Sequence, residues 1–166
     1  MLIIAVSVIL DQLTKYIALT DLKPIGSHPF IPKLLEFRFT LNEGIAWGML
    51  AGKKWIFIPV SILAIGIVIY IIIRYRKQIS PLLCISLAMI AGGGIGNQID
   101  RIVSGSVVDF LNFLFMDFPI FNVADCFVCV GCILAIFSVL VFDRSILFDD
   151  TNTEKKKSEK SKDESK

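Results

Sequence analysis

The 166-residue sequence contains a single histidine, His28, which stands directly before Pro29 in a short proline-rich segment. It has no H-E-x-x-H pair that could hold a catalytic zinc ion and no G-x-S-x-G turn that could present a serine nucleophile. These absences argue against a zinc protease and against a serine–histidine hydrolase. If the chain is a hydrolase, carboxylates are the remaining plausible acid and base.

Cysteine is also scarce. Three of the four cysteines, Cys126, Cys129 and Cys132, follow one another at a spacing of three, and Cys84 stands apart. Thiolates at this spacing share a helical face and could in principle bind a metal ion. Because no histidine stands near them and the surrounding run is apolar, we expect them to pack as small hydrophobic side chains. We therefore predict no metal, no cofactor and no disulfide framework.

Charge is sparse as well, at 19% of the residues, whereas 55% are hydrophobic and the mean hydropathy is +0.72. This composition is typical of a membrane protein. The apolar residues gather in four runs, each close to the length of about 20 residues that a helix needs to cross a bilayer. The runs cover residues 2–19, 55–73, 82–99 and 121–142. The predicted fold is an α-helical membrane protein with four transmembrane helices.

The first run is interpreted as a retained helix, because it lacks the basic leading region of a secretory signal and carries Asp11 and Lys15. Basic residues at 74, 76 and 77 follow the second run, and lysines recur in the last segment, 143–166. The positive-inside rule places both in the cytoplasm, and with them the N-terminus. The outer segments are then about 20–54 and 100–120, although lysine and arginine in the first of them weaken this asymmetry.

The chain divides into a membrane domain at 1–142 and a charged tail at 143–166. The tail mixes lysine, glutamate and serine and has little to bury, so we predict a disordered cytoplasmic segment. The net charge of +2 shows no nucleic-acid footprint.

The first outer segment has a period-2 pattern, in which hydrophobic residues at 35, 37, 39 and 41 alternate with polar ones. Such alternation predicts a half-buried strand and hence a small extracytoplasmic β-sheet. Three prolines keep the approach to this strand extended, and Asn42-Glu43-Gly44 supplies a turn at its end.

Candidate functional residues are charged or amide side chains within or beside the apolar runs, where they are unfavourable unless they serve a purpose. They are Asp11, Lys15, Asn42, Asn97, Asp100, Arg101, Asp109, Asn122 and Asp125. The spacing of Asp11 and Lys15 is that of an i,i+4 ion pair, so a structural role is preferred for these two.

Asp109 and Asp125 are the favoured acid and base, since both would lie near the same membrane surface. Two neighbouring carboxylates share one proton: the ionised one can activate water while the protonated one polarises a carbonyl. Asp100 adjoins Arg101 and follows Asn97, which suits a supporting hydrogen-bond network better.

The glycines at 92, 93, 94 and 96 remove side chains from one stretch of the third helix. They permit the close approach of another backbone or of a lipidated substrate, and composition does not choose between these uses. Two other functions stay open on the residues alone: a small transporter or channel subunit whose carboxylates form a proton or ion path, and an inactive binding or chaperone-like protein.

Five blocks of sequence carry a family resemblance. They are Asp11-Gln12-Leu13-Thr14-Lys15, Asn42-Glu43-Gly44-Ile45-Ala46-Trp47-Gly48, Gly93-Gly94-Ile95-Gly96-Asn97-Gln98-Ile99-Asp100-Arg101, Val107-Val108-Asp109-Phe110 and Phe121-Asn122-Val123-Ala124-Asp125. In this order the chain closely resembles the lipoprotein signal peptidases, the type II signal peptidases of bacteria.

The resemblance implies an intramembrane aspartyl endopeptidase of the inner (cytoplasmic) membrane. It would remove the signal peptide from diacylglyceryl-modified prolipoproteins by cutting just before the lipidated cysteine. The implied catalytic pair is Asp109 and Asp125. The implied supporting and substrate-holding residues are Asn42, Asn97, Asp100, Arg101, Asn122, Asp11 and Lys15. We expect a monomer in contact with membrane lipid, with the active site at the outer face.

Two departures from the family pattern leave this pair untouched. The family usually has phenylalanine where Trp47 stands, which bears on fine substrate preference. Almost nothing precedes the first helix, so the true start could lie upstream.

Overall fold

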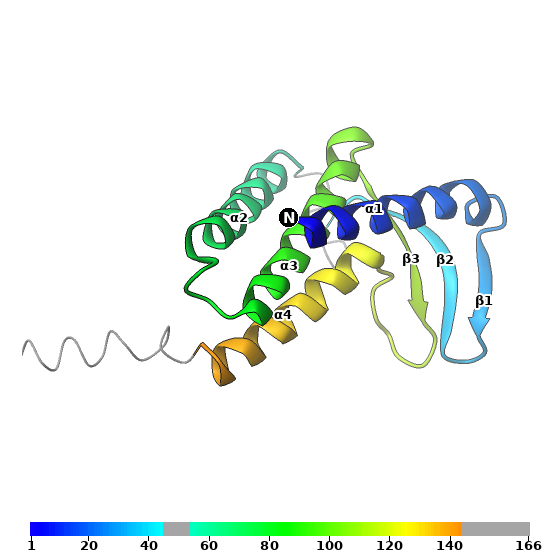
Figure 1. Ribbon diagram of the computed structural model, residues 1–166. Coiled ribbons are helices and arrows are strands. Elements are labelled where there is room, and N and C mark those ends of the chain that lie inside the picture. The colour runs from blue at the N-terminus through cyan, green and yellow to red at the C-terminus, as the bar shows by residue number, and fades with distance from the viewer. Residues whose placement is uncertain (45–53, 144–166) are drawn as a thin grey trace, which may run out of the picture.

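The computed structural model describes residues 1–44 and 54–143. Within these residues it contains four long helices and a three-stranded antiparallel sheet that lies at one end of the helices (Figure 1). Each helix is long and apolar enough to cross a membrane, which confirms the predicted four spans.

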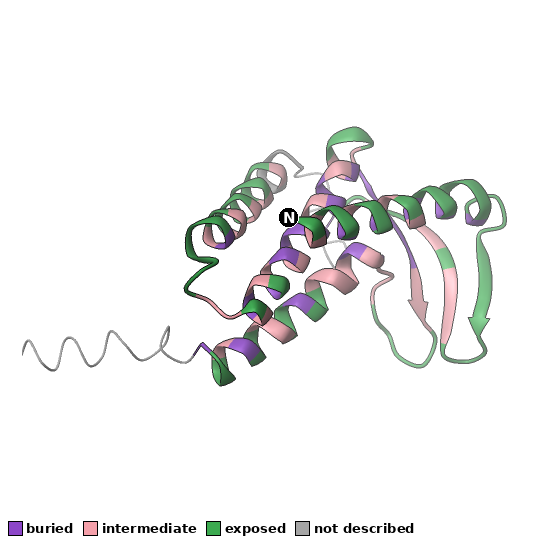
Figure 2. Cartoon of the chain, in the orientation of Figure 1, coloured by how far each residue is buried: buried purple, intermediate pink, exposed green. Residues whose placement is uncertain are grey.

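Helix α1 (Leu2–Ile17) turns a polar stripe toward the protein interior. Its buried residues are Ser7, Asp11 and Lys15, which recur every four positions and therefore share one face. The apolar remainder of the helix faces outward, as the exposed surface in Figure 2 shows. The helix continues as a π-helical turn, η1 (Ala18–Leu22), so the first span ends beyond the predicted boundary at residue 19.

Helix α3 (Pro81–Val103) is the central element, because it packs against α1, α2 (Lys54–Tyr75) and α4 (Val123–Val141). Ser80 caps its start by accepting a hydrogen bond from the backbone N–H of Leu83 at 3.1 Å.

Glycines in α3 allow the neighbouring helices to approach closely. A Cβ atom added at Gly93 would collide with the Ala124 carbonyl of α4, and one at Gly96 would collide with the Asp11 carboxylate of α1. A Cβ atom at Gly92 would meet Ser7 of α1 at 2.6 Å. Of the two uses that the sequence left open for these glycines, the structure accounts for helix packing.

A polar clasp joins the start of α3 to the end of α4, at the end of the bundle opposite the sheet. Ser80 donates its backbone N–H to Asp143 Oδ1 at 2.8 Å, and Ser138 donates its hydroxyl to Asp143 Oδ2 at 2.9 Å. Asp143 is buried and so belongs to the folded bundle, although the predicted tail included it. The rest of that tail, 144–166, lies outside the described residues.

The sheet has the order β1 (Ser27–Ile31), β2 (Leu35–Asn42), β3 (Val107–Phe113). The predicted strand at 35–41 is confirmed by β2. One face of the sheet packs on η1 through a small hydrophobic cluster of Ala18, Leu22, Val108 and Phe110, with Phe37 and Phe39 beside it.

Two parts of the outer segments differ from the predicted loops. Helix α3 extends through Asp100 to Val103, and β3 occupies the middle of what was expected to be a connection. The hydrophobic residues of β3 do not alternate clearly with polar ones, because its start is buried on both faces. The predicted turn at Asn42 is confirmed by the Gly44 N–H, which donates to Asn42 Oδ1 at 3.0 Å, whereas Trp47 lies outside the described residues.

Candidate active site

Asp109 lies on β3, on the face of the strand opposite to Phe110. Because successive side chains of a strand alternate between its faces, packing Val108 and Phe110 against η1 turns Asp109 toward the helix bundle. Its side chain is only 2% exposed. Two amides donate to its carboxylate: Asn42 Nδ2 to Oδ2 at 2.9 Å and Asn122 Nδ2 to Oδ1 at 2.6 Å.

Asp125 lies in the first turn of α4, where it forms a reciprocal cap with Asn122. The backbone N–H of Asn122 donates to Asp125 Oδ2 at 3.1 Å, and the backbone N–H of Asp125 donates to Asn122 Oδ1 at 3.0 Å. This arrangement holds both side chains in fixed orientations at the helix start. Asp125 is half-buried, so its carboxylate is more accessible than that of Asp109.

Two asparagines bridge the two aspartates. Asn122 Nδ2, which reaches Asp109, also lies 3.0 Å from Asn97 Oδ1, and Asn97 Nδ2 donates to Asp125 Oδ1 at 2.8 Å. The path from one carboxylate to the other therefore runs through two side-chain amides from α3 and the start of α4. The two aspartates were predicted to lie near the same membrane surface, and the structure joins them to both asparagines in one network.

A buried cation lies behind this network. Lys15 Nζ is 2.9 Å from Asp11 Oδ2 and 3.0 Å from Asp100 Oδ2, and it donates to Asn97 Oδ1 at 2.8 Å. The predicted i,i+4 pair is confirmed, but Lys15 also ties α1 to two residues of α3. Asp11 also accepts the backbone N–H of Ala124, which links α1 to α4, and Asp100 accepts the backbone N–H of Val108, which links α3 to the sheet.

Gln12 belongs to the same cluster, although no role was predicted for it. Its Nε2 donates to Asp100 Oδ1 at 3.0 Å and to the Gly96 carbonyl at 3.2 Å. A polar residue next to Asp11 inside an apolar run was the available signal.

A cavity of about 530 Å³ opens on the aspartates. Its polar lining is Asn42, Asn97, Arg101, Asp109 and Asp125. Arg101 is half-buried and donates to the Asn97 carbonyl at 3.4 Å. The apolar lining comes from the end of β3, from the segment before α4 and from α4 itself, including Phe113, Phe118, Phe121, Cys126 and Cys129. The cavity therefore combines two carboxylates with an apolar wall.

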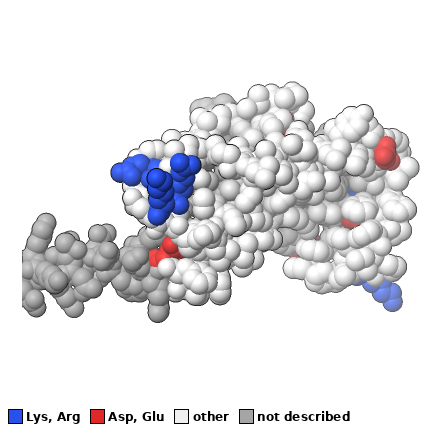
Figure 3. Space-filling view, in the orientation of Figure 1, with Lys and Arg blue, Asp and Glu red and all other residues white. Residues whose placement is uncertain are grey.

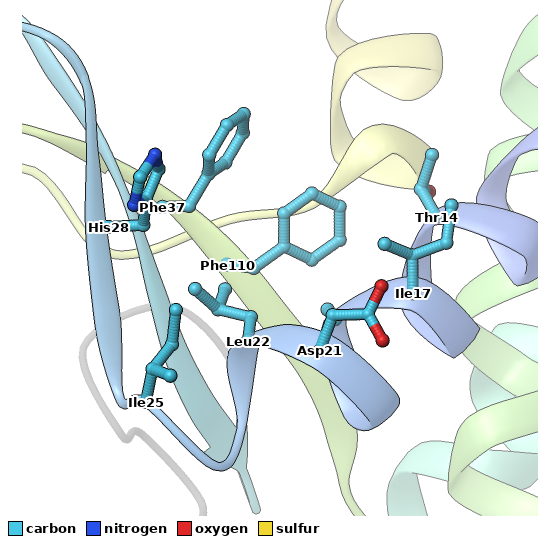
Figure 4. Close-up of a pocket in the computed structure, with 9 residues that line it drawn as sticks. Thr14, Ile17, Asp21, Leu22, Ile25, His28, Phe37 and Phe110 are labelled. Atoms are coloured by element: carbon cyan, nitrogen blue, oxygen red, sulfur yellow. The ribbon is translucent and has the colours of Figure 1, made fainter.

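The sheet separates this cavity from a second one. The second cavity, of about 310 Å³, lies between η1 and the other face of the sheet, where Leu22, Phe37 and Phe110 line it together with His28 (Figure 4). His28 is thus on the face away from Asp109. In the part of the chain that the structure describes, no group of three or more histidine, cysteine, aspartate or glutamate side chains could hold a metal ion.

Burial raises the pKa of Asp109 to about 6. The hydrogen bond from Asn42 opposes this rise by stabilising the carboxylate, and the negative charge of Asp125 adds to it. A carboxyl group with this pKa retains a proton at a pH where an ordinary aspartate has lost it. The Asp109 carboxyl group can therefore serve as a proton donor.

A family model and individual relatives match most of the chain. The family model described as signal peptidase (SPase) II matches residues 3–141. A protein named lipoprotein signal peptidase from Listeria monocytogenes serotype 4a is 44% identical over 137 residues, which are 81% of this chain and 88% of that protein. One of the same name from Caldanaerobacter subterraneus is 45% identical over 133 residues, 80% of this chain and 89% of that protein.

Two solved structures, each described as a bacterial membrane enzyme, have the same fold. The first has a TM-score of 0.76 and 38% sequence identity, and the match covers 84% of this chain and 85% of the solved chain. The second has a TM-score of 0.74 and 37% sequence identity, and the match covers 85% of this chain and 92% of the solved chain.

Proposed function

The chain belongs to the signal peptidase II family and removes signal peptides from prolipoproteins as an aspartic-type peptidase, and we propose that Asp109 and Asp125 are its catalytic pair. The single observation that carries this assignment is the amide bridge between them. Asn122 and Asn97 hold the two carboxylates at the same cavity, from β3 and α4, by hydrogen bonds of 2.6 and 2.8 Å.

We propose that Asp109 carries the shared proton at rest. Support comes from its greater burial and from its pKa of about 6. Asp125 is more accessible than Asp109, so water can reach its carboxyl group, and it is held in place by hydrogen bonds from Asn97 and from the Asn122 backbone. Asp125 is accordingly the base and Asp109 the acid at the start of the reaction.

In the first step Asp125 takes a proton from a water molecule, whose oxygen attacks the carbonyl carbon of the scissile peptide bond. Asp109 gives its proton to the carbonyl oxygen, so a neutral tetrahedral diol forms and the two carboxyl groups exchange protonation states. In the second step the diol collapses: the C–N bond breaks, the peptide nitrogen receives the proton held by Asp125, and Asp109 recovers a proton from a diol hydroxyl. The products are a signal peptide with a new carboxyl end and a lipoprotein with a free amino group.

The remaining polar residues hold the two aspartates and the substrate in position. Asn42 and Asn122 orient the Asp109 carboxyl group, and Asn97 orients that of Asp125. Arg101 lines the cavity with hydrogen-bond donors that can receive substrate carbonyl oxygens. The ion cluster of Asp11, Lys15 and Asp100 fixes Asn97 from behind. The apolar wall suits the diacylglyceryl group of a substrate held in the membrane.

We further propose that the sheet and the cavity lie on the outer face of the bacterial inner membrane, with both termini in the cytoplasm. Support comes from the positive-inside rule. Arg74 lies in the last turn of α2, and Arg76 and Lys77 follow the helix. Lysine and arginine side chains gather at this end of the molecule, away from the sheet (Figure 3). Since both aspartates and both bridging amides come from one chain, a monomer is sufficient.

The assignment is tested with purified protein and a diacylglyceryl-modified prolipoprotein. Asp109→Asn and Asp125→Asn should each abolish cleavage while the protein stays folded in detergent. Asp21→Asn is the control, because Asp21 is exposed and lies outside the cavity of the pair. Full cleavage by either dyad variant would overturn the assignment.

A further inference from the structure

The end of the sheet that points away from the bundle is formed by two connections lying side by side. Ile31 ends β1 and Leu34 lies in the β1–β2 turn, and the connection from β3 to α4 begins at Leu114. The backbone N–H of Leu114 donates to the Leu34 carbonyl at 3.0 Å, so the two connections form one surface (Figure 1).

This surface exposes large hydrophobic side chains. We call it the apolar tip and define it as Ile31, Leu34, Leu114, Phe115, Met116 and Phe118, each of which is exposed. Phe115 reaches 58% exposure. A contiguous patch of this kind is unfavourable in water and marks an interaction surface.

The apolar tip is continuous with the membrane-spanning surface through packed aromatic rings. Phe118 lies 5.7 Å from Phe121, between ring centroids, and Phe121 precedes the start of the fourth span at Val123 by two residues. Phe113 lies 5.0 Å from Phe121 and 5.3 Å from Phe115, so the rings lead from the edge of the span to the exposed tip. The same rings of Phe113, Phe118 and Phe121 also line the cavity of the aspartates.

The charges at the tip suit a lipid headgroup layer. Lys33 and Asp117 are both exposed there, one in each connection. A lysine with its stem along apolar side chains can place its ammonium group among lipid phosphates. A single aspartate beside it limits the depth, because an ionised carboxylate is unfavourable in the hydrocarbon core.

We propose that the apolar tip inserts into the membrane leaflet on the side of the sheet, with Phe115 and Met116 below the headgroups of phospholipids. The sheet then has a second attachment to the bilayer besides η1. This attachment holds β3, and with it Asp109, at the level where the cavity meets lipid. Its partner is the bilayer itself and not a second protein.

The test places a tryptophan at the tip of the full-length protein in phospholipid nanodiscs. Phe115→Trp is made in a background in which Trp47 and Trp55 are phenylalanine, and quenching by phospholipids brominated along their acyl chains is measured. Phe137→Trp is the reference, because Phe137 is exposed on the spanning part of α4. The proposal predicts that the brominated lipids remove a comparable share of the fluorescence in both variants. Fluorescence at position 115 that brominated lipid leaves unchanged and aqueous iodide quenches would overturn it.

A second variant tests whether the two connections insert together. The reporter is Ile31→Trp in the same background, and the change is the pair Phe115→Asp and Met116→Asp. Because Phe115 and Met116 are exposed, the midpoint of thermal unfolding should not change. Quenching of the fluorescence of the Ile31→Trp reporter by brominated lipids should decrease. If the acidic pair lowers the midpoint, Phe115→Ser replaces it. Quenching of the reporter that persists in a folded variant would show that the tip is not held by these side chains.

Discussion

At the scale of single residues, the two ends of each side-chain amide decide how the site works. Asn97 accepts hydrogen bonds at its oxygen from Lys15 and Asn122 and donates from its nitrogen to Asp125. An ionised aspartate at this position could not donate to Asp125 and would add a negative charge to the site. The asparagine therefore bridges the two aspartates without changing the charge of the site.

Asn42 sets the pH range in which Asp109 holds its proton. In the intact protein, kcat/KM should fall as pH rises through about 6, because Asp109 then loses the proton that the reaction needs. Asn42→Ala removes a hydrogen bond that favours the ionised form, so the pKa of Asp109 should rise and the falling limb should move to higher pH. The measurement is kcat/KM for a lipid-modified substrate as a function of pH.

The matched control for this shift is Asn112→Ala. Asn112 lies on β3, as Asp109 does, but its side chain donates to Glu36 at 2.7 Å, outside the cavity. In Asn112→Ala, the falling limb of the kcat/KM profile should lie at the same pH as in the unchanged protein. An Asn42→Ala limb that stays in place or moves to lower pH would contradict the role given to this amide.

At the scale of the elements, α1 is held in the bundle by a polar stripe in which Lys15 neutralises buried carboxylates. Lys15→Met should destabilise the protein by about 3–5 kcal/mol, because Asp11 and Asp100 would remain buried without a cation. Unfolding in detergent measures the change. Adding Asp11→Asn and Asp100→Asn should restore much of the stability, since the neutral set leaves no unpaired charge.

The control for Lys15 is Lys23→Met, because Lys23 is exposed at the end of η1. A small change is expected there. If Lys15→Met were equally small in effect, the ion cluster would not be what holds α1 in place.

The glycines of α3 make a second prediction at this scale. Gly93→Ala should destabilise by about 1–3 kcal/mol through overpacking, because the new methyl group would meet the backbone carbonyl of Ala124, which has little freedom to move. Gly66→Ala in α2 is the matched control, since a Cβ atom there has no neighbour within 4 Å. That control should be neutral or stabilising, because alanine favours the helix. Equal thermal midpoints for the two variants would rule out close packing at Gly93.

At the scale of the whole molecule, the proposed orientation can be tested from outside the cell. Two single substitutions to cysteine serve as reporters, Arg38→Cys and Lys77→Cys. Arg38 is exposed on β2, and Lys77 follows α2 at the other end of the bundle. A thiol reagent that does not cross membranes should label Arg38→Cys in intact cells and Lys77→Cys only after permeabilisation. The unchanged protein, with its four native cysteines, gives the background. The opposite labelling pattern would reverse the orientation.

The sequence was sufficient for the spans, because these depend on a local feature, runs of apolar residues. It also indicated the candidate pair, as carboxylates beside those runs. It was not sufficient for β3, whose start is buried on both faces and lacks alternation. Nor could it predict that Lys15 reaches Asp100 and Asn97 as well as Asp11, since those contacts join residues more than 80 positions apart. The roles assigned to the site residues stay predictions.

The most direct test of the central claim separates binding from cleavage in one tube. A diacylglyceryl-modified prolipoprotein is first bound to an excess of Asp109→Asn or Asp125→Asn protein, its affinity is measured, and cleavage of the bound substrate is then followed over a single turnover. The pair described above predicts near-normal affinity and a cleavage rate lower by about 10²–10⁴-fold or more in each variant. Cleavage of the bound substrate at the unchanged rate by either variant would contradict it.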